Sequence, residues 1–311
     1  MTVNETNPHY LISVVGPTAS GKTELAIGLA EYFGTEVVSA DSRQFFREMT
    51  AGTAKPTASE LARVPHHFIN SHSIAQTYNA GEFATDALSV IERLHLSHTA
   101  VVMAGGSGLY CKAVWEGFDE MPVVAEGVRD QLNEEARSGG MAGLLDELAA
   151  KDPDYFAIVD RNNVQRVVRA LEVVRSSGRP YSAFRQAKEA VARPFRTIKI
   201  GLEPPRDVLY DRINGRMDRM IAAGLFEEAE ALYPFRQHQA LQTVGYQEVF
   251  GYLEGRYDRE ETIRLLKRNS RRYAKRQLTW FHRDTDIRWF GSPLPGPVIA
   301  FVRQCMEQGM G

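Results

Sequence analysis

The stretch Gly16-Pro-Thr-Ala-Ser-Gly-Lys-Thr23 decides the fold of this 311-residue chain. Its spacing is that of a phosphate loop, in which a second glycine, a lysine and a hydroxyl residue follow the first glycine at fixed positions. The apolar run at 10–15 before it predicts a buried strand, and the pattern at 24–33 after it predicts a helix. This order predicts an α/β fold, a P-loop NTPase-like parallel sheet flanked by helices.

The chemistry of such a loop is anion binding. Its backbone N–H groups converge on phosphate oxygens at a helix N-terminus, the ammonium of Lys22 adds positive charge, and the Thr23 hydroxyl can ligate Mg²⁺. The residues that we expect to hold a diphosphate are Gly16, Pro17, Thr18, Ala19, Ser20, Gly21, Lys22 and Thr23. Mg²⁺ is the expected cofactor.

Another strand signal, at 100–103, is followed by Gly105 and Gly106. A nucleotide hydrolase usually carries an aspartate there that helps to hold Mg²⁺. Its absence weighs against nucleotide hydrolysis, but many small-molecule kinases also lack that aspartate. Phosphoryl transfer therefore stays open.

Strand and helix signals alternate unevenly along the chain. Strands are also expected at 35–40, 197–202 and 287–290, whereas 120–194 shows only helical periodicity, at 128–136, 142–150 and 163–175. We therefore expect a catalytic core made of 1–117 and 195–311 and a helical insertion domain at 118–194. Helical patterns continue at 207–222, 226–232, 246–253 and 260–280.

Composition places few further limits. The net charge of −2 is uninformative, because RNA binding needs only a local concentration of Lys and Arg. The two cysteines, Cys111 and Cys305, are too few for a disulfide framework, which suggests a reducing compartment. Neither a secretory signal nor an apolar run long enough for a membrane span is present, so a cytoplasmic protein without a membrane partner is expected.

Asp41 follows the second expected strand, in the string Asp41-Ser-Arg-Gln44. Open parallel sheets place ligand-contacting residues at such strand ends, so Asp41 is aimed near the phosphate loop. A turn or helix cap is the plainer alternative.

Six strings together resemble the tRNA dimethylallyltransferases over nearly the whole chain. They are GPTASGKT at 16–23, DSRQ at 41–44, GTAKP at 52–56, GGSGLY at 105–110, QRVVR at 165–169 and KRQLTW at 275–280. The sequence departs from the family pattern at Phe46, where Tyr is expected, at Ser107, where Thr is usual, and at Asn70, where Asp is frequent. Asn70 removes a carboxylate, whereas Ser107 keeps a hydroxyl.

The resemblance implies transfer of a dimethylallyl group from its diphosphate to N6 of the adenosine 3′-adjacent to the anticodon. An adenine amine is a poor nucleophile, so a carboxylate that accepts its proton would help, and Asp41 is the candidate base. Ser107 lies in a glycine-rich turn and is expected to contact the base or the diphosphate, although a turn-forming role is equally open. Arg216 is the member of the helical stripe Arg212, Arg216 and Arg219 that best fits the family pattern for diphosphate binding.

The tRNA partner would contact two regions, by the same resemblance. The expected tRNA-binding residues are Asp41, Ser42, Arg43, Gln44, Ser107, Arg129, Gln165, Arg166, Val167, Val168 and Arg169. The segment 264–283 adds eight Lys or Arg residues and no acid, which is typical of a helix that follows phosphates, although a solvated charged helix is the alternative. His66 and His67 lack companion ligands for zinc, and structural roles are favoured. A monomer is expected.

Three other functions remain open at this point. A related transferase that prenylates free adenine nucleotides would share the loop and Asp41 but need no RNA surface. A P-loop small-molecule kinase would need only the loop, and a tRNA-binding protein without catalysis would need only the basic surface.

Overall fold

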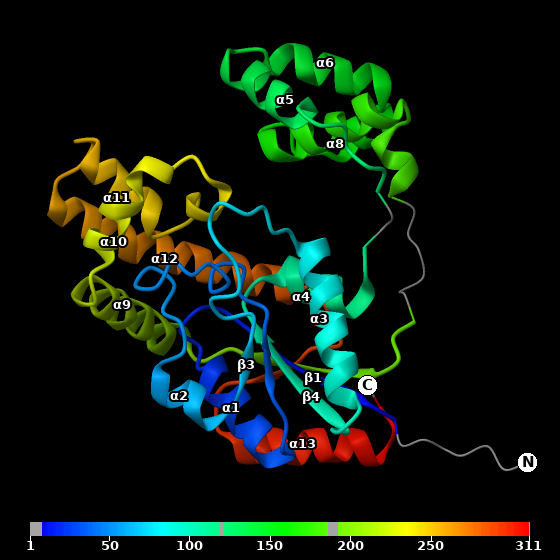
Figure 1. The fold of residues 1–311 in the computed structure, drawn as a ribbon, viewed down its shortest axis with the longest axis vertical. Helices are drawn as coiled ribbons and strands as arrows, with labels where there is room; N and C mark the ends of the chain where they lie inside the picture. The colour runs from blue at the N-terminus through cyan, green and yellow to red at the C-terminus, as the bar shows by residue number, and fades with distance from the viewer. Residues whose placement is uncertain (1–7, 119–120, 186–191, 311) are drawn as a thin grey trace, which may run out of the picture. The chain divides into compact units, whose positions relative to one another are not determined.

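The computed structural model describes residues 8–118, 121–185 and 192–310. The chain divides into two compact units, one formed by the segments up to residue 116 and from residue 192, and the other by 117–191. Figure 1 shows the larger unit as a sheet wrapped by helices and the smaller unit as helices alone.

The larger unit is built on one six-stranded parallel sheet of order β3-β2-β4-β1-β5-β6. This confirms the predicted fold class. The strands are β1 (Tyr10–Val15), β2 (Val37–Ser39), β3 (His66–His67), β4 (Ala100–Gly105), β5 (Arg196–Leu202) and β6 (Arg288–Phe290). Since β1 pairs with both β4 and β5, the loop that follows it leaves from the middle of the carboxyl edge.

Helices cover both faces of the sheet, and β1 is therefore buried on both sides. Leu11 and Val15 pack with α3 (Ala80–His95) and α4 (Gly108–Glu116), whereas Ile12 and Val14 pack with α1 (Lys22–Phe33) and α13 (Pro295–Glu307). Side chains alternate across a strand, so one continuous apolar run serves two cores. A short α2 (Ala58–Arg63) precedes β3.

Several elements of the larger unit were not expected from the sequence: α2, β3, α3, α4 and α13. For α3 the signal was present, because Asn79 and Glu82 form a capping box and Phe83, Ala87 and Ile91 recur at helical spacing. The strand at β2 is also shorter than the expected 35–40.

Four more helices lie beside the sheet's carboxyl edge: α9 (Arg206–Ala222), α10 (Leu225–Leu232), α11 (Tyr246–Leu253) and α12 (Arg259–Phe281). Their bounds agree with the expected helices to within two residues. Leu209 and Ile213 of α9 pack against Ala274 of α12, and a separate apolar cluster joins α9, α10, α11 and α12. The polar faces of α9 and α12 are thereby brought towards the phosphate loop.

The smaller unit is helical throughout its described residues. It contains α5 (Val128–Arg137), α6 (Met141–Lys151), α7 (Pro153–Ile158), α8 (Val164–Ser177) and a short 3-10 helix (Tyr181–Phe184). Its core includes Leu132, Leu144, Leu148 and Leu171. Asp152 caps α7 through the Tyr155 N–H and accepts from Ser182, which ties the end of the unit to its middle.

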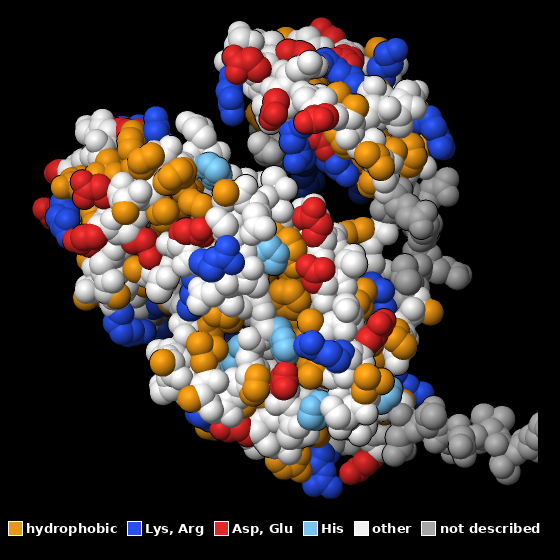
Figure 2. Space-filling model, in the orientation of Figure 1, with side chains coloured by type: hydrophobic (Ala, Val, Ile, Leu, Met, Phe, Trp, Pro, Cys, Tyr) orange, Lys and Arg blue, Asp and Glu red, His pale blue; other side chains and the backbone are white. Residues whose placement is uncertain are grey.

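Charges of both signs are mixed on the visible face of the molecule. On the face drawn in Figure 2, acidic and basic side chains are interspersed rather than gathered into a field of one sign. Among the described residues, no helix combines the length and the apolar character that crossing a membrane requires.

Candidate active site

The phosphate loop lies between β1 and α1, as its spacing predicts. Gly21 begins α1 with φ 99°, a left-handed conformation that suits glycine, and no side chain caps the helix there. The first N–H groups of α1 are therefore directed at the space in front of the helix, where the helix dipole also favours an anion. The Lys22 ammonium donates to the Pro17 carbonyl at 2.6 Å, which folds it back over the loop.

The glycines that end β4 are required by close packing. A Cβ on Gly105 would overlap the Ala40 carbonyl, and one on Gly106 would overlap the Gln277 side-chain amide. A side chain at Gly105 would collide with backbone, and one at Gly106 would displace Gln277, which is a physical reason for glycine instead of aspartate at these two positions. Gln277 uses the space instead: it accepts from the Thr18 N–H at 2.9 Å and donates to the Gly106 carbonyl at 2.8 Å.

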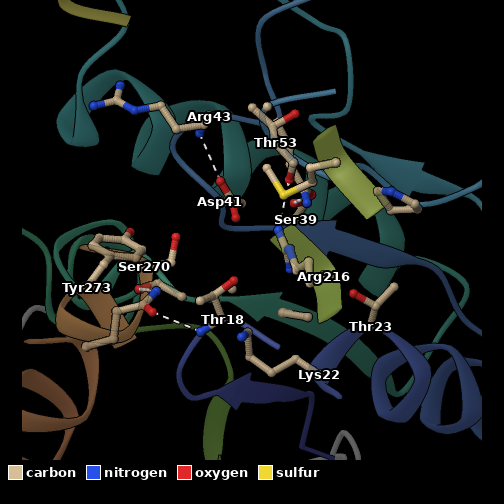
Figure 3. A pocket seen from close by; sticks show the side chains of 18 of the residues that line it. Thr18, Lys22, Thr23, Ser39, Asp41, Arg43, Thr53, Arg216, Ser270 and Tyr273 are labelled. Carbon is tan, nitrogen blue, oxygen red and sulfur yellow. Dashed lines mark hydrogen bonds between the residues drawn. The ribbon is translucent and has the colours of Figure 1, made fainter. Parts of the chain in front are cut away.

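A single cavity opens in front of the loop. Side chains from separate elements line it and point toward its centre: Thr18 and Lys22 from the loop and α1, Asp41 from the end of β2, Arg216 from α9 and Tyr273 from α12 (Figure 3). Thr23, the predicted metal ligand, also lines it, as do Arg43, Gln44 and Thr53. The cavity thus brings an anion-binding loop and a carboxylate to one place.

The cations of the cavity are crowded and desolvated. Burial, and then the positive charge of Arg216, lower the pKa of Lys22 to about 8. Burial likewise lowers the pKa of Arg216, and the negative charge of Asp41 opposes this. Two cations held together away from water are favoured when an anion lies between them, so the cavity suits a phosphate or diphosphate group.

Asp41 is held by its own turn. Its Oδ1 accepts from the Arg43 N–H at 2.9 Å, so the turn role that the sequence offered as an alternative coexists with a place in the cavity wall. Tyr273 faces it: burial, followed by the negative charge of Asp41, raises the pKa of the Tyr273 phenol to about 12. The phenol therefore remains protonated at neutral pH and is available as a donor beside the carboxylate.

Ser107 lies beside the turn that carries Asp41. Its Oγ accepts from the Ser42 N–H at 3.0 Å and lies 3.1 Å from the Ser42 Oγ, and neither serine is among the residues that line the cavity. The contact fixes the backbone next to Asp41. Contact of Ser107 and Ser42 with the reacting groups therefore remains a prediction, and in this structure both serines hold the turn that carries Asp41.

The arginine stripe of α9 faces the loop side of the larger unit. Arg216 donates to the Thr53 carbonyl at 3.1 Å and lines the cavity, and Arg212 reaches the Ser20 carbonyl at 3.5 Å. Arg219 lines a neighbouring hollow together with Lys55. The stripe thus extends the positive surface outward from the cavity.

The expected RNA-binding residues of the smaller unit fall into two groups. Gln165 and Arg166 are exposed, and Arg129 and Arg169 both pair with the buried carboxylate of Glu172, the former at 2.7 Å. The side chains of Val167 and Val168 are 0% and 1% exposed in the core of the unit. Their side chains pack in this core, so RNA contact at these two positions remains a prediction of the family resemblance.

Some of the basic side chains of α12 already have partners within the protein. Lys267 pairs with Asp218 of α9 at 2.7 Å, and Arg271 donates to Asn214 at 2.7 Å. These two residues hold α9 against α12, and phosphate binding by the rest of the segment remains a prediction. Arg272 and Lys275 are exposed and remain as candidates.

The histidine pair has structural partners. His67 contacts Glu36 at 2.6 Å, and His66 contacts the Val64 carbonyl at 2.8 Å. Within the described ranges, no group of three His, Cys, Asp or Glu side chains could hold a metal ion. Asn70, the departure from the family pattern, accepts from the Lys55 ammonium at 2.6 Å.

Tyr273 and Gln277 are the site residues that sequence reasoning missed. Ser270, Tyr273 and Gln277 lie at helical spacing on one face of α12, and all three line the cavity. Polar residues at i, i+3 and i+7 beside an apolar stripe were the available signal.

A phosphate loop at the carboxyl edge of a parallel sheet, with two cations and a carboxylate around one cavity, defines a P-loop NTPase-like enzyme that binds a phosphorylated substrate. The sequence profile of the IPP transferase family matches residues 44–284. The chain belongs to this family and is a prenyltransferase.

Individual relatives are consistent with membership of this family. The chain is 52% identical to the tRNA dimethylallyltransferase of Cytophaga hutchinsonii over 96% of its length and 98% of the relative's. It is 48% identical to that of Christiangramia forsetii, over 91% and 93%. The solved tRNA isopentenylpyrophosphate transferase of Bacillus halodurans is 38% identical and superposes with a TM-score of 0.71, covering 96% and 97%. A eukaryotic dimethylallyltransferase acting on tRNA, 23% identical, shares the fold with a TM-score of 0.79 over 97% and 80%.

Proposed function

We propose that this chain transfers a dimethylallyl group from dimethylallyl diphosphate to N6 of the adenosine 3′-adjacent to the anticodon of tRNAs. The observation that carries the proposal is the single cavity in which Lys22 and Arg216 face the carboxylate of Asp41. The names of the relatives, which are tRNA dimethylallyltransferases, support the same substrates.

The phosphate loop serves the leaving group. The N–H groups at the start of α1, the Lys22 ammonium and the Arg216 guanidinium would neutralise the charge that grows on the diphosphate as the allylic C–O bond breaks. These donors are already in place before reaction, because Pro17 and Thr53 carbonyls fix the two cations. The loop thus stabilises departure of diphosphate rather than transfer of a phosphoryl group.

Mg²⁺ is the cofactor that we propose. The Thr23 hydroxyl lines the cavity beside Lys22, which fits an ion held by one protein oxygen, water and substrate phosphates. When bound, Mg²⁺ would add positive charge to the diphosphate oxygens.

Asp41 is the proposed base. The N6 lone pair forms the new C–N bond, the C–O electron pair leaves with the diphosphate, and the N6 proton passes to the Asp41 carboxylate. The N–H of Arg43 holds one carboxylate oxygen, which fixes the direction of the group. Tyr273, protonated at neutral pH, offers a donor to the adenine or its ribose.

RNA binding is proposed for exposed and half-buried residues of both units. In the smaller unit these are Gln165, Arg166, Arg129 and Arg169, the last two oriented by Glu172. In the larger unit, Arg43 and Gln44 would meet the base that enters the cavity, and Arg272 and Lys275 would meet phosphates. An anticodon loop suits such a site because its bases are already partly unstacked.

A further part of the proposal concerns the state of the protein. The larger unit supplies the phosphate loop, Lys22, Arg216 and Asp41, so the proposed chemistry needs no residue from a second copy, and we propose a monomer as the active form. Because tRNA is the proposed substrate, we place the activity in the cytoplasm. Sedimentation of the active fraction at the mass of a dimer would contradict the monomer.

The test incubates the protein with labelled dimethylallyl diphosphate and an unmodified tRNA transcript, followed by digestion to nucleosides. We expect the label in N6-dimethylallyladenosine, and none with a transcript whose target adenosine is replaced by guanosine. Faster labelling of free AMP or ATP would select the nucleotide transferase. ATP turnover without dimethylallyl diphosphate binding would select a kinase, and tRNA binding without any turnover would select a non-catalytic RNA-binding protein.

A further inference from the structure

Glu228, in the first turn of α10, makes an unusual set of contacts with a distant loop. Its Oε2 accepts from the N–H groups of Thr50 and Ala51, both at 2.8 Å, and its Oε1 accepts from the Gly52 N–H at 2.9 Å. The Oε1 also accepts from the Tyr246 hydroxyl at 2.6 Å. Four donors from two segments thus converge on one carboxylate.

The loop that Glu228 holds leads directly into the cavity. Gly52 and Thr53 line it, and the Thr53 carbonyl is the acceptor for the Arg216 guanidinium at 3.1 Å. The Thr53 hydroxyl donates in turn to the Met49 carbonyl at 2.6 Å, which closes the loop on itself. The position of the Arg216 acceptor therefore depends on a loop whose amides are fixed by Glu228.

The same carboxylate fixes a second segment of the cavity wall. Tyr246, which is fully buried, follows Thr243 and Val244, and these two residues line the cavity. A Cβ on Gly52 would overlap the Tyr246 ring, so the two segments meet only because position 52 is glycine. Glu228 lies where these two segments join.

A simpler role for Glu228 would be to stabilise its own helix. Glu227 and Glu228 are both in the first turn of α10, where an acid interacts favourably with the helix dipole. Glu227 is exposed, whereas Glu228 points to the loop. The helix dipole accounts equally for both acids, but it does not account for contacts with three consecutive amides of another segment.

We propose that Glu228 is a positioning residue for the transfer reaction: through the loop 50–53 it sets the Arg216 guanidinium for the diphosphate of the substrate. The proposal rests on the proposed function, in which Arg216 binds that diphosphate. A carboxylate is required at this position because both of its oxygens accept hydrogen bonds, and the four donors contact both of them.

The test compares Glu228→Gln with Glu227→Gln. Both changes remove one charge from the first turn of α10, but only the first places an amide NH₂ group against loop donors. We expect Glu228→Gln to raise the KM for dimethylallyl diphosphate about tenfold and to leave the KM for tRNA within about twofold, because a diphosphate ligand is misplaced and the RNA surface is not. Glu227→Gln should match wild type in both.

A double variant tests whether Glu228 acts through Arg216. If Glu228 works through that guanidinium, the double variant Glu228→Gln/Arg216→Gln loses no more affinity for inorganic diphosphate than Arg216→Gln alone. Losses that add, or equal rises in both KM values, would overturn the proposal and leave a general role in stability. Because calorimetry with inorganic diphosphate needs no transfer, it separates this outcome from a failure of the proposed function, which would appear as absent transfer by the wild-type protein.

A milder variant covers the case in which Glu228→Gln does not fold. Tyr246→Phe removes one of the four donors and keeps the carboxylate and the loop amides. We expect a smaller rise in the same KM, about twofold to fivefold, with no change in the KM for tRNA. An unchanged KM for dimethylallyl diphosphate would contradict the proposal.

Discussion

Replacement of Asp41 by asparagine is the most direct test of the proposed chemistry. Asparagine keeps a side-chain oxygen that can accept from the Arg43 N–H, so the turn after β2 should remain in place. What is lost is the group that takes the proton from N6. A positioned general base contributes typically 10² to 10⁴ in rate, so we expect the single-turnover transfer rate to fall by about that factor.

Diphosphate binding, in contrast to the transfer rate, should not be weakened by this substitution. The charge of Asp41 favours the protonated forms of Lys22 and Arg216, but it also repels a bound diphosphate. Removal of that charge should leave the Kd for inorganic diphosphate unchanged or slightly lower. The fall in rate without weaker binding corresponds to a barrier higher by about 2.7 to 5.4 kcal/mol.

The assay combines rapid-quench transfer with calorimetry of diphosphate binding. Asp207→Asn, which neutralises an exposed acid in the first turn of α9, serves as the control and should retain the wild-type rate. A near-wild-type transfer rate for Asp41→Asn would remove the base role. A lost rate that is accompanied by lost diphosphate binding would instead indicate a collapsed cavity.

Three further predictions follow from particular contacts. Because the pKa of Lys22 is lowered to about 8, the Kd for dimethylallyl diphosphate should rise by up to about tenfold per pH unit above that value, as the ammonium loses its proton; Lys22→Arg should flatten this dependence, and a flat wild-type profile would contradict it. Neutralising Arg272 and Lys275 together should lower the slope of log Kd for tRNA against log salt by about 1.4 to 1.8, and an unchanged slope would exclude them as phosphate ligands. Asn70→Asp should give Lys55 a charged partner and raise the Tm by about 1 to 2 °C, consistent with about 0.5 kcal/mol for an exposed pair, and a lower Tm in thermal unfolding would refute the gain.

Local features of the sequence were the most predictable. The phosphate loop is fixed by eight consecutive residues, and its conformation depends on glycines and on the strand and helix at its ends. Helices α5, α6 and α8 of the smaller unit and the α-helices of the segment 206–281 follow from the spacing of apolar residues, so their bounds were expected to within a few residues, whereas α7 was not expected. The place of Asp41 near the phosphate loop was also predictable, because the carboxyl ends of parallel strands lie at one edge of the sheet.

Charge pairing was less predictable than helix position. The segment 264–283 contains no acid, yet Lys267 meets Asp218, which lies on another helix. Val167 and Val168 stand between polar residues of an RNA-binding string, and their burial depends on helices packed around them. A sequence string states which residues are neighbours along the chain, but it does not state which face of a helix is covered.

The sequence by itself determined the class of fold, the phosphate loop and the family, because each depends on residues close together or on strings in a fixed order. Only the tertiary structure decided that Tyr273 and Gln277 complete the cavity, that Ser107 supports the turn of Asp41 from behind, and that Glu228 holds a loop from 176 to 178 positions away. Such contacts arise when α9, α10 and α12 pack at the carboxyl edge of the sheet. Burial and hydrogen bonding between distant segments then set the positions of the charges around the cavity.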